Sequence, residues 1–295
     1  MLVAAEVMQK ETTFLEDVDR RLEEVLGAVS HPHFRRILRE SAQGGKRVRP
    51  LLTSLACEAA GGNARDALDA AVAVELLHVA SLVHDDIMDH ATTRRGSPTV
   101  VAAHGAQAAI LSGDLLLAAA FRLICHARFG QTGEACRILS GAFFDLCEGQ
   151  ACDLLPISDA GSERDDHRSM VERKTARLLE AAAALGGICA GAEERHVRAL
   201  GLFGLHIGMA YQAQDDLLDL TGDESAAGKT LRLDSANGRT TFLSVAYSRT
   251  DRMGAVRGEI AFHTGTALRE LDLLPPSDAR ESLRALSLSL MNRTA

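Results

Sequence analysis

Two segments of the sequence repeat the same arrangement of carboxylates. HDDIMD begins at residue 84 and QDDLLD at residue 214, so their leading aspartates lie 215 − 85 = 130 residues apart. In a helix, positions i and i+4 share a face. The first and last aspartates of each segment therefore form a pair, Asp85 with Asp89 and Asp215 with Asp219. The middle aspartate of each segment points about 100° away from its pair.

The two acidic pairs require a positive partner. Carboxylates at this spacing repel each other, and the repulsion grows in a half-buried cleft because the effective dielectric constant falls. Solvated acidic faces are the alternative, but both pairs adjoin apolar runs, LLHVASLV and GMAYQAQ. The spacing does not fit an EF-hand calcium loop, and zinc favours His or Cys ligands. Magnesium takes one or two carboxylates together with substrate phosphates, so the pattern predicts Mg²⁺ and a diphosphate substrate between two acidic helices.

Basic residues fit the same kind of substrate. Arg94 and Arg95 follow the first acidic segment, and their guanidinium groups can bind phosphate oxygens in a bidentate manner. Lys46 and Arg49 follow a Gly-Gly pair at the start of a predicted helix, which is typical of an anion site. The segment GGKR also fits a plain loop-to-helix junction, and it lacks the spacing of a Walker loop. His78, taken alone, is more typical of a buried core histidine.

The composition favours a helical protein and excludes some partners. Apolar residues make up 46% of the 295 residues, and there are only six prolines. A net charge of −8 argues against a general nucleic-acid binder. The six cysteines form no C-x-x-C motif, so we expect reduced thiols and a cytoplasmic location. The first residues, MLVAAEVMQKETT, have no basic region followed by a long apolar core, so no signal peptide is expected. The longest apolar runs are interrupted by Glu75 and His78 or by Asp114, so no transmembrane segment is expected.

Hydrophobic periodicity of the helical type runs along the chain, and no convincing strand is found. Polar or Gly-rich loops separate the predicted helices, including an arginine loop after Asp89 and a loop over residues 222–238. The helices cover 12–29, 33–40, the segment GGKRVRPLLTSLACEAAGG, 64–89, 105–129, 131–155, 164–187 and 192–221, with shorter helices to the C-terminus. No linker divides the chain. We therefore expect one all-α domain over residues 1–295.

The chain resembles the trans-isoprenyl diphosphate synthases, the family that makes geranyl, farnesyl, geranylgeranyl and longer polyprenyl diphosphates. The resemblance covers nearly the whole chain. It rests on seven ordered motifs: GGKRVRP, ELLHVASLVHDDIMD with RRGSPT, LSGDLLLAAAF, EGQACDL, ERKTARLLE, MAYQAQDDLLDLTGD and GKTLRLDSANGR. It implies the isoprenoid synthase fold, a helical bundle with a central cavity between two Asp-rich helices. It also implies a transferase that condenses an allylic diphosphate with isopentenyl diphosphate.

The resemblance assigns roles residue by residue. Three magnesium ions that clamp the allylic diphosphate would be held by Asp85, Asp89 and Asp215. The acidic rims would be completed by Asp86, Asp216 and Asp219. Further charge on the same diphosphate would come from Arg94, Lys174, Lys229 and Arg239. Isopentenyl diphosphate would be bound by Lys46, Arg49, His78 and Arg95. Thr175 and Gln212 would lie beside the developing carbocation, and the released diphosphate would take the proton that is lost.

Three positions depart from the family pattern. Arg239 replaces the usual second lysine of the late loop, and Phe242 stands where proline is frequent. His167 or a neighbour replaces a tyrosine that often precedes the KT pair. None of these changes removes an expected metal ligand, so an active enzyme is expected.

Two other classes share part of this pattern. A class I terpene cyclase has the fold and the magnesium, but its second metal motif is not a second D-D-x-x-D, and it lacks a GGKRVRP segment. A non-catalytic subunit of a heteromeric synthase usually loses one aspartate cluster, and this chain keeps both.

The resemblance also bears on product length and assembly. In farnesyl-making relatives, bulky aromatic residues before the first aspartate cluster close the product pocket, whereas this chain has Ala80 and Ser81 there. The floor of a deeper pocket would then be formed by Leu77 and, one turn further, by Val74 on the same face of the helix. A product of at least twenty carbons is expected. The segment AAILSGDLLLAAAFRLI is apolar on more than one face and has to be covered, which predicts a homodimer.

Overall fold

The computed structural model describes the backbone of residues 2–127, 130–155, 163–221 and 251–291, and the side chains of these residues except 2–11, 163–164 and 219–221. Contacts between residues divide the chain into two compact units. Unit 1 comprises Met1–Leu139 and Leu185–Ala192, and unit 2 comprises Ser140–Ala184 and Glu193–Ala295. The expectation of one domain over residues 1–295 stays a prediction.

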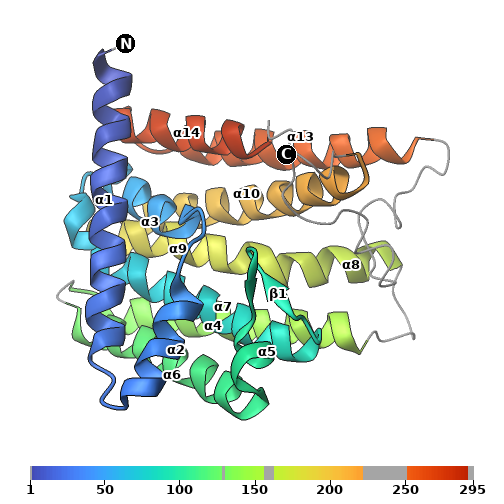
Figure 1. The fold of residues 1–295 in the computed structure, drawn as a ribbon. Helices are drawn as coiled ribbons and strands as arrows, with labels where there is room; N and C mark the ends of the chain where they lie inside the picture. Colours follow the sequence, from blue (N-terminus) through green and yellow to red (C-terminus); the bar gives the residue numbers. More distant parts are fainter. Residues whose placement is uncertain (1, 128–129, 156–162, 222–250, 292–295) are drawn as a thin grey trace. The chain divides into compact units, whose positions relative to one another are not determined.

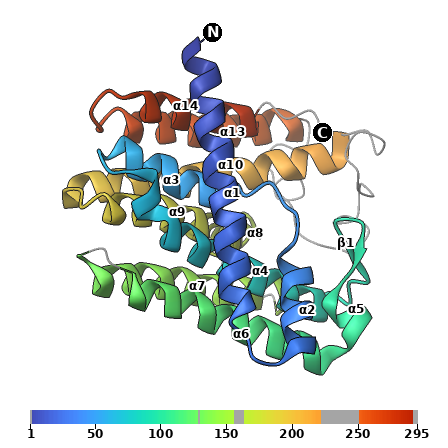
Figure 2. The same cartoon turned by 60° about the vertical axis from the view of Figure 1, so that its left-hand side comes forward.

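Unit 1 is built almost entirely from helices (Figure 1, Figure 2). In chain order they are α1 (Leu2–Gly27), α2 (Pro32–Ala42), α3 (Val48–Ala59), the 3₁₀ turn η1 (Ala64–Ala67), α4 (Leu68–Met88), α5 (Val100–His104) and α6 (Ala106–His126). The first turns of α7 (Thr132–Leu154) and the last turn of α9 (Arg177–Cys189) also belong to this unit. The predicted all-α class is confirmed.

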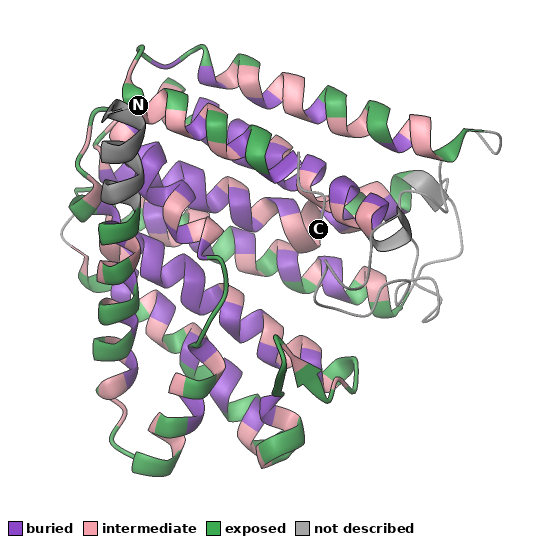
Figure 3. Cartoon of the chain, turned by 45° about the horizontal axis from the view of Figure 1, so that its top comes forward, coloured by how far each residue is buried: buried purple, intermediate pink, exposed green. Residues whose placement is uncertain are grey.

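Helix α4 forms the core of unit 1. Its residues from Ala70 to Ser81 are all buried except His78. Figure 3 colours the chain by burial and shows the buried residues gathered on the inner helices. A helix that is apolar on every face has to be covered on every face, and α4 packs against α3 and α6. The predicted helix 64–89 in fact begins with the 3₁₀ turn η1, because the Asn63 side chain accepts the Arg65 N–H at 2.9 Å and caps that turn.

Two stretches are long and apolar enough to cross a membrane by length and hydropathy alone. The first is Ala64–Met88, whose most apolar stretch of 18 residues is 72% buried. The second is Ala106–His126, whose most apolar stretch is 39% buried. The first is the core helix just described. The second, α6, keeps an exposed apolar face that includes Ile110, Leu111 and Leu115.

The arginine loop contains a short β-hairpin, so the prediction that no strand would form was wrong. Strands β1 (Thr93–Arg94) and β2 (Ser97–Pro98) pair antiparallel with Arg94 opposite Ser97. The two residues between them, Arg95 and Gly96, have φ angles of 53° and 76°. A two-residue hairpin turn of type I′ needs positive φ at both central positions. The pairing is too short to show any alternating pattern in the sequence.

Unit 2 is also helical. Besides the remaining parts of α7 and α9, it contains α8 (Glu163–Val171), the π-helical turn η2 (Glu172–Ala176), α10 (Glu194–Thr221), α13 (Arg252–Leu271) and α14 (Asp278–Met291). Helix α10 packs along α13 and against η2. Their shared apolar cluster includes Ala176 from η2, Ala213 from α10 and Val256 from α13.

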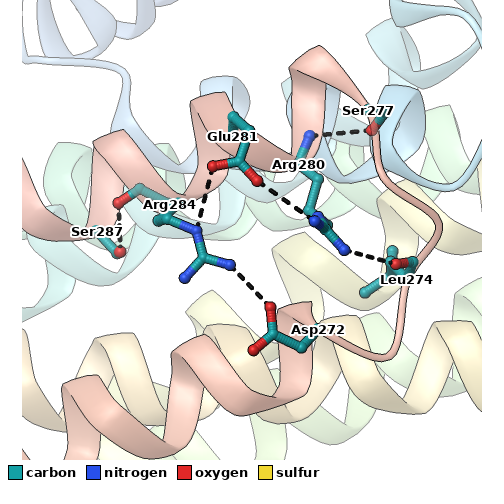
Figure 4. Close-up of polar contacts among 7 residues, drawn as sticks. All are labelled: Asp272, Leu274, Ser277, Arg280, Glu281, Arg284 and Ser287. Carbon is teal, nitrogen blue, oxygen red and sulfur yellow. Dashed lines mark hydrogen bonds and ion pairs between the residues drawn. The ribbon is translucent and has the colours of Figure 1, made fainter.

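The connection between α13 and α14 is fixed by side-chain bonds to the backbone and across the turn (Figure 4). The Arg280 guanidinium donates to the Leu274 carbonyl at 3.0 Å, and the backbone N–H of Arg280 donates to Ser277 Oγ at 3.1 Å. Arg284 Nη2 lies 2.8 Å from Asp272 Oδ1. Because these bonds span the turn, they hold α14 antiparallel to α13.

A pair of histidines, the half-buried His206 and the buried His263, lies between α10 and α13. His206 Nδ1 is 2.8 Å from His263 Nδ1, and His263 Nε2 lies 3.4 Å from Arg168 Nη2 and 3.6 Å from Glu259 Oε2. His263 is 2% exposed. Burial, followed by repulsion from His206 and Arg168, lowers the pKa of His263 to about 4.

We expect the protein to lose stability as the pH falls from 6.5 to 4. An unfolded histidine takes up its proton near pH 6.5, whereas folded His263 does so only near its pKa of about 4. Between these two values the unfolded state therefore binds more protons than the folded state. The free energy of unfolding decreases as the pH is lowered through this range, by up to about 3 kcal/mol. Urea titrations across the window measure it. His263→Gln, which keeps a polar group but does not titrate, should flatten the slope, and an unchanged slope would contradict the assignment.

Candidate active site

The C-terminal end of α4 carries three carboxylates, Asp85, Asp86 and Asp89. Asp89 is the C-cap, and its N–H donates to the Asp85 carbonyl at 2.8 Å, so these two residues lie one turn apart as predicted. Asp85 is half-buried, Asp86 is buried and Asp89 is exposed. The helix macrodipole is negative at this end and disfavours each carboxylate by about 0.3–1 kcal/mol. Cations are therefore needed at the end of α4.

The β-hairpin supplies one of those cations. Arg94 Nη2 and Nε donate to Asp86 Oδ1 at 2.7 and 2.9 Å, and Nε lies 3.1 Å from Oδ2. Asp86 is only 3% exposed, so the carboxylate of this charge-assisted contact is buried, whereas the Arg94 side chain is 37% exposed. Arg94, predicted to bind a diphosphate, is thus bonded to a carboxylate of the acidic segment, which fixes the position of its guanidinium.

The Gly-Gly segment before α3 carries a second arginine in an unusual backbone conformation. Gly44 and Gly45 have φ angles of 72° and 94°, and Arg47, the N-cap of α3, has a φ of 48°. Glycine adopts positive φ readily, but arginine does so only when its surroundings hold it there. Lys46, between them, is exposed.

Arg47 is held by three elements of unit 1. Its guanidinium donates to Glu75 Oε1 on α4 at 2.7 Å, to the Ala42 carbonyl at the end of α2 at 2.7 Å, and to Asp19 Oδ1 on α1 at 3.1 Å. Arg47 is 9% exposed and Glu75 is 2% exposed. Removing one partner of such a buried pair leaves an uncompensated charge, which is far more costly than the pair itself is stabilising. This contact fixes the Gly-Gly segment to the core helix.

His78 lies one turn after Glu75 on α4 and is surrounded by positive charge. The pKa of His78 is held well below its ordinary value, first by burial and then by repulsion from guanidinium groups. Those groups belong to Arg49, Arg95, Arg94 and Arg47. A neutral imidazole among arginines can donate a hydrogen bond without adding to the repulsion. The predicted isopentenyl diphosphate set of Arg49, His78 and Arg95 is therefore brought together within unit 1.

Gly45 leaves the space that Arg95 occupies. A Cβ atom at Gly45 would lie 2.8 Å from Arg95 Nη1 and 2.9 Å from its Cζ. Arg95 Nη1 also donates to the Gln43 carbonyl at 3.4 Å. The Gly-Gly segment and the hairpin therefore meet at the guanidinium of Arg95, although they are separated by about fifty residues in the sequence.

In unit 2, the end of α10 carries the second acidic segment. Asp215 is half-buried, and Asp216 is 5% exposed. Gln212 Nε2 donates to Asp216 Oδ1 at 2.9 Å, and His167 Nε2 lies 3.9 Å from Asp216 Oδ2. The pKa of His167 is lowered to about 4, chiefly by burial. These carboxylates lie in the last two turns of α10, which ends at Thr221.

The predicted residues Lys174 and Thr175 lie in the π-helical turn η2. Lys174 Nζ is 2.6 Å from Asp153 Oδ2 on α7, and Thr175 Oγ1 donates to Gln212 Oε1 on α10 at 3.2 Å. Single π-helical turns are frequent at functional sites. Two glycines give this turn room: a Cβ at Gly149 would lie 2.5 Å from the Lys174 N, and one at Gly208 would lie 2.5 Å from the Ala176 Cα.

Some predicted residues are not placed. The side chain of Asp219 and all of Lys229, Arg239 and Phe242 lie outside the described residues. In the part of the chain that the structure describes, no three His, Cys, Asp or Glu side chains converge on one point as they would in a preformed metal cage. Magnesium does not require such a cage, because water and substrate phosphates usually complete its six ligands.

Comparison with known proteins identifies the family. The polyprenyl synthetase family model matches residues 31–257. A short chain isoprenyl diphosphate synthase of Methanothermobacter thermautotrophicus is 32% identical over 98% of this chain and 99% of its own length. The chain belongs to the polyprenyl synthetase family.

Other members of the polyprenyl synthetase family agree with that assignment. The geranylgeranyl diphosphate synthase of Sulfolobus acidocaldarius is 40% identical over 68% of this chain, and the aligned stretch covers 62% of that enzyme. The crystal structure of a geranylgeranyl pyrophosphate synthetase from Pyrococcus horikoshii is 31% identical, covers 98% of this chain and 99% of its own, and has a TM-score of 0.83. The predicted isoprenoid synthase fold is confirmed.

The residues predicted to set product length lie in the core of unit 1. Ala80 and Leu77 have no exposed surface and Ser81 is 7% exposed, and the Ser81 hydroxyl donates to the His78 carbonyl at 2.8 Å. No bulky side chain occupies positions 80 and 81 of α4. Their part in product length stays a prediction for this member of the family.

Sequence reasoning missed the groups that hold the predicted residues in place. Glu75 was noted only as an interruption of an apolar run, and Arg47 and Asp153 were not assigned a role. The available signal was the acid itself, since a glutamate inside the run LDAAVAVELLHVAS is seldom buried without a basic partner. Which arginine would be that partner does not follow from spacing.

Glu75→Leu should destabilise the protein by about 3–5 kcal/mol, because it removes the buried carboxylate partner of Arg47 and leaves the exposed Asp19 as its ionic partner. The double variant Arg47→Met with Glu75→Leu removes both charges and should recover most of that loss. Urea unfolding of the parent, the single and the double variants measures the difference. A single variant within about 1 kcal/mol of the parent would show that Arg47 does not depend on Glu75.

Proposed function

We propose that this chain is a trans-prenyltransferase that condenses an allylic diphosphate with isopentenyl diphosphate and releases diphosphate. The observation that carries the proposal is the group of arginines around His78. One of them, Arg94, donates to Asp86 and so joins this group to the acidic end of α4. So much positive charge around a neutral imidazole favours an anionic ligand, and guanidinium groups fit phosphate oxygens. The family membership supports the same reaction class.

The two substrates would use different groups. Lys46, Arg49, His78 and Arg95 are proposed to bind isopentenyl diphosphate without a metal. The allylic diphosphate would be bound through Arg94, Lys174, Lys229 and Arg239, with magnesium held by Asp85, Asp89 and Asp215. When bound, Mg²⁺ neutralises negative charge that develops on a leaving diphosphate. Three ions per site are proposed, and the fit rests on hard carboxylate oxygens at helix ends.

The remaining residues would orient the reacting groups. Gln212 is fixed by Thr175 on one side and by Asp216 on the other, so its amide cannot turn freely. We assign Thr175 and Gln212 to the developing allylic cation, towards which oxygen dipoles are stabilising. The bond from allylic carbon to diphosphate oxygen breaks, a carbon–carbon bond to isopentenyl diphosphate forms, and the released diphosphate takes the proton.

Incubation of the full chain with Mg²⁺, an allylic diphosphate and isopentenyl diphosphate tests the reaction class. Chain extension supports the proposal. Cyclisation of the allylic diphosphate alone would instead indicate a class I terpene cyclase, and no reaction would indicate a non-catalytic subunit. Neither alternative is favoured, because the chain keeps both acidic segments and the family relatives are named as synthases.

Asp85→Ala and Asp215→Ala should each lower the rate by several orders of magnitude, because each removes a proposed metal ligand. Asp278→Ala, at an exposed position in the first turn of α14, serves as the matched control and should leave the rate unchanged. Initial rates at saturating magnesium measure the effect. Activity of either cluster variant within tenfold of the parent would refute its role as a ligand.

We propose geranylgeranyl diphosphate or a longer product. Small residues at Ala80 and Ser81 leave the face of α4 before the acidic segment without a bulky side chain, and relatives named geranylgeranyl diphosphate synthase support a twenty-carbon product.

Ala80→Phe should shift the product to farnesyl diphosphate, because a large ring would fill the space before the acidic segment. Ser81→Phe tests the same space should the fully buried Ala80 position not tolerate the ring, and circular dichroism checks the fold of both. Chromatography of the dephosphorylated products gives the chain length. Farnesol as the main product of the parent would show that Ala80 and Ser81 do not determine the depth of the product pocket.

Assembly as a homodimer is proposed from α6. Ile110, Leu111 and Leu115 are 48, 56 and 39% exposed, and a second copy of the chain would cover them. Light scattering should give twice the chain mass of 31.5 kDa. Leu111→Glu should shift the mass towards that of a single chain, and a parent of single-chain mass would refute the proposal.

We further propose a cytoplasmic enzyme with no transmembrane segment and no nucleic-acid partner.

A further inference from the structure

Two cysteines of unit 1 have their sulfur atoms in contact. Cys125 is exposed in the last turn of α6, and Cys136 is half-buried near the start of α7. Their Sγ atoms are 3.7 Å apart. A disulfide bond is about 2.05 Å long, so the sulfurs have to approach by about 1.6 Å to form one.

The other four cysteines differ in accessibility or spacing. Cys57 and Cys189 are buried, and burial raises the pKa of Cys57 to about 12 and that of Cys189 further. Buried protonated thiols of this kind are chemically inert. Cys147 and Cys152 both lie on α7 but five positions apart, so they do not share a helix face as residues three or four apart do.

We propose that Cys125 and Cys136 form a redox-active dithiol that closes to an intramolecular disulfide when a peroxide is the oxidant. The exposed Cys125 thiol reaches the oxidant first, and the partly shielded Cys136 resolves the product. No part of this site belongs to the acidic segments or to the arginines around His78, so the proposal is independent of the reaction assigned above.

The chemistry balances with hydrogen peroxide as the only co-reactant. The Cys125 sulfur attacks one peroxide oxygen, the O–O bond breaks, and a sulfenic acid and one water result. The Cys136 sulfur then attacks Cys125 Sγ, the S–O bond breaks, and the departing hydroxide takes the Cys136 proton to form a second water. Two thiols are oxidised and one peroxide is reduced. A dithiol reductant reverses the step by thiol–disulfide exchange.

The link would fix the corner between α6 and α7 without reaching the acidic end of α4. His84, next to the first aspartate of α4, lies 3.3 Å from the Ile110 carbonyl near the start of α6. Cys125 is fifteen residues further along α6, which is about 22 Å at the helical rise. Oxidation should therefore raise the thermal midpoint of the protein, because it removes freedom from the unfolded chain, and leave the rate of catalysis within about twofold.

Thiol counting on the full chain tests the proposal. Reduced protein denatured in iodoacetamide should take up six alkyl groups, and protein treated first with hydrogen peroxide in its native state should take up 6 − 2 = 4. Non-reduced peptide mapping should find Cys125 joined to Cys136, and dithiothreitol should restore all six thiols. A higher thermal midpoint of the oxidised protein should vanish with the reductant.

Matched variants separate this pair from general oxidation. Cys125→Ser and Cys136→Ser should each abolish the loss of two thiols, whereas Cys147→Ser, at an exposed position on α7, should preserve it. Overturning results are sulfinic acid at Cys125 with Cys136 still free, a covalent dimer on a non-reducing gel, or a link that appears only after denaturation.

Discussion

Like charges gathered at the ends of two helices constrain the rest of this structure. Helix α4 ends in Asp85, Asp86 and Asp89, at the pole where the macrodipole is already negative, and α10 ends in the same pattern. In unit 1 the arginines near this negative charge also repel one another, and the imidazole of His78 among them stays neutral. A ligand carrying several negative charges would relieve the repulsion among the arginines, and cations would relieve the repulsion among the carboxylates. The proposed substrates, one diphosphate bound with magnesium and one bound without metal, would satisfy both demands.

The backbone is strained where these charges are held. Among the described residues, the non-glycine positions with positive φ are Arg47, which bonds to Glu75 of α4, and His90 and Arg95, which follow the acidic end of α4. Such conformations cost about 1–3 kcal/mol each and persist only where the surroundings fix them. Arg47 is fixed by Glu75 and two other elements, and Arg95 by the I′ turn of the hairpin. Of the two strained arginines, Arg95 belongs to the proposed anion-binding set, whereas Arg47 is bonded to carboxylates and holds the Gly-Gly segment in place.

The sequence indicated the carboxylate pairs and the helices because both depend on local spacing. The i, i+4 rule placed Asp85 and Asp89 one turn apart, and the apolar run of α4 was long enough to be read as one core helix. The sequence could not show the contacts between segments that are distant along the chain. Glu75 with Arg47 and Lys174 with Asp153 join elements 28 and 21 residues apart, and no periodicity links them. The hairpin was missed because two paired residues per strand leave no alternation to detect, and the turn residue Arg95 is not one that favours positive φ.

We propose that unit 1 contains a diphosphate site that is made of arginines and needs no metal. Calorimetric titration of isopentenyl diphosphate into metal-free protein tests this site. We expect saturable binding in the presence of a chelator, weakened by added salt and by Arg49→Met, and unchanged in Asp85→Ala. An unreactive allylic diphosphate analogue should bind only when Mg²⁺ is present. Binding of isopentenyl diphosphate that requires Mg²⁺, or that is unaffected by Arg49→Met, would refute the metal-free arginine site.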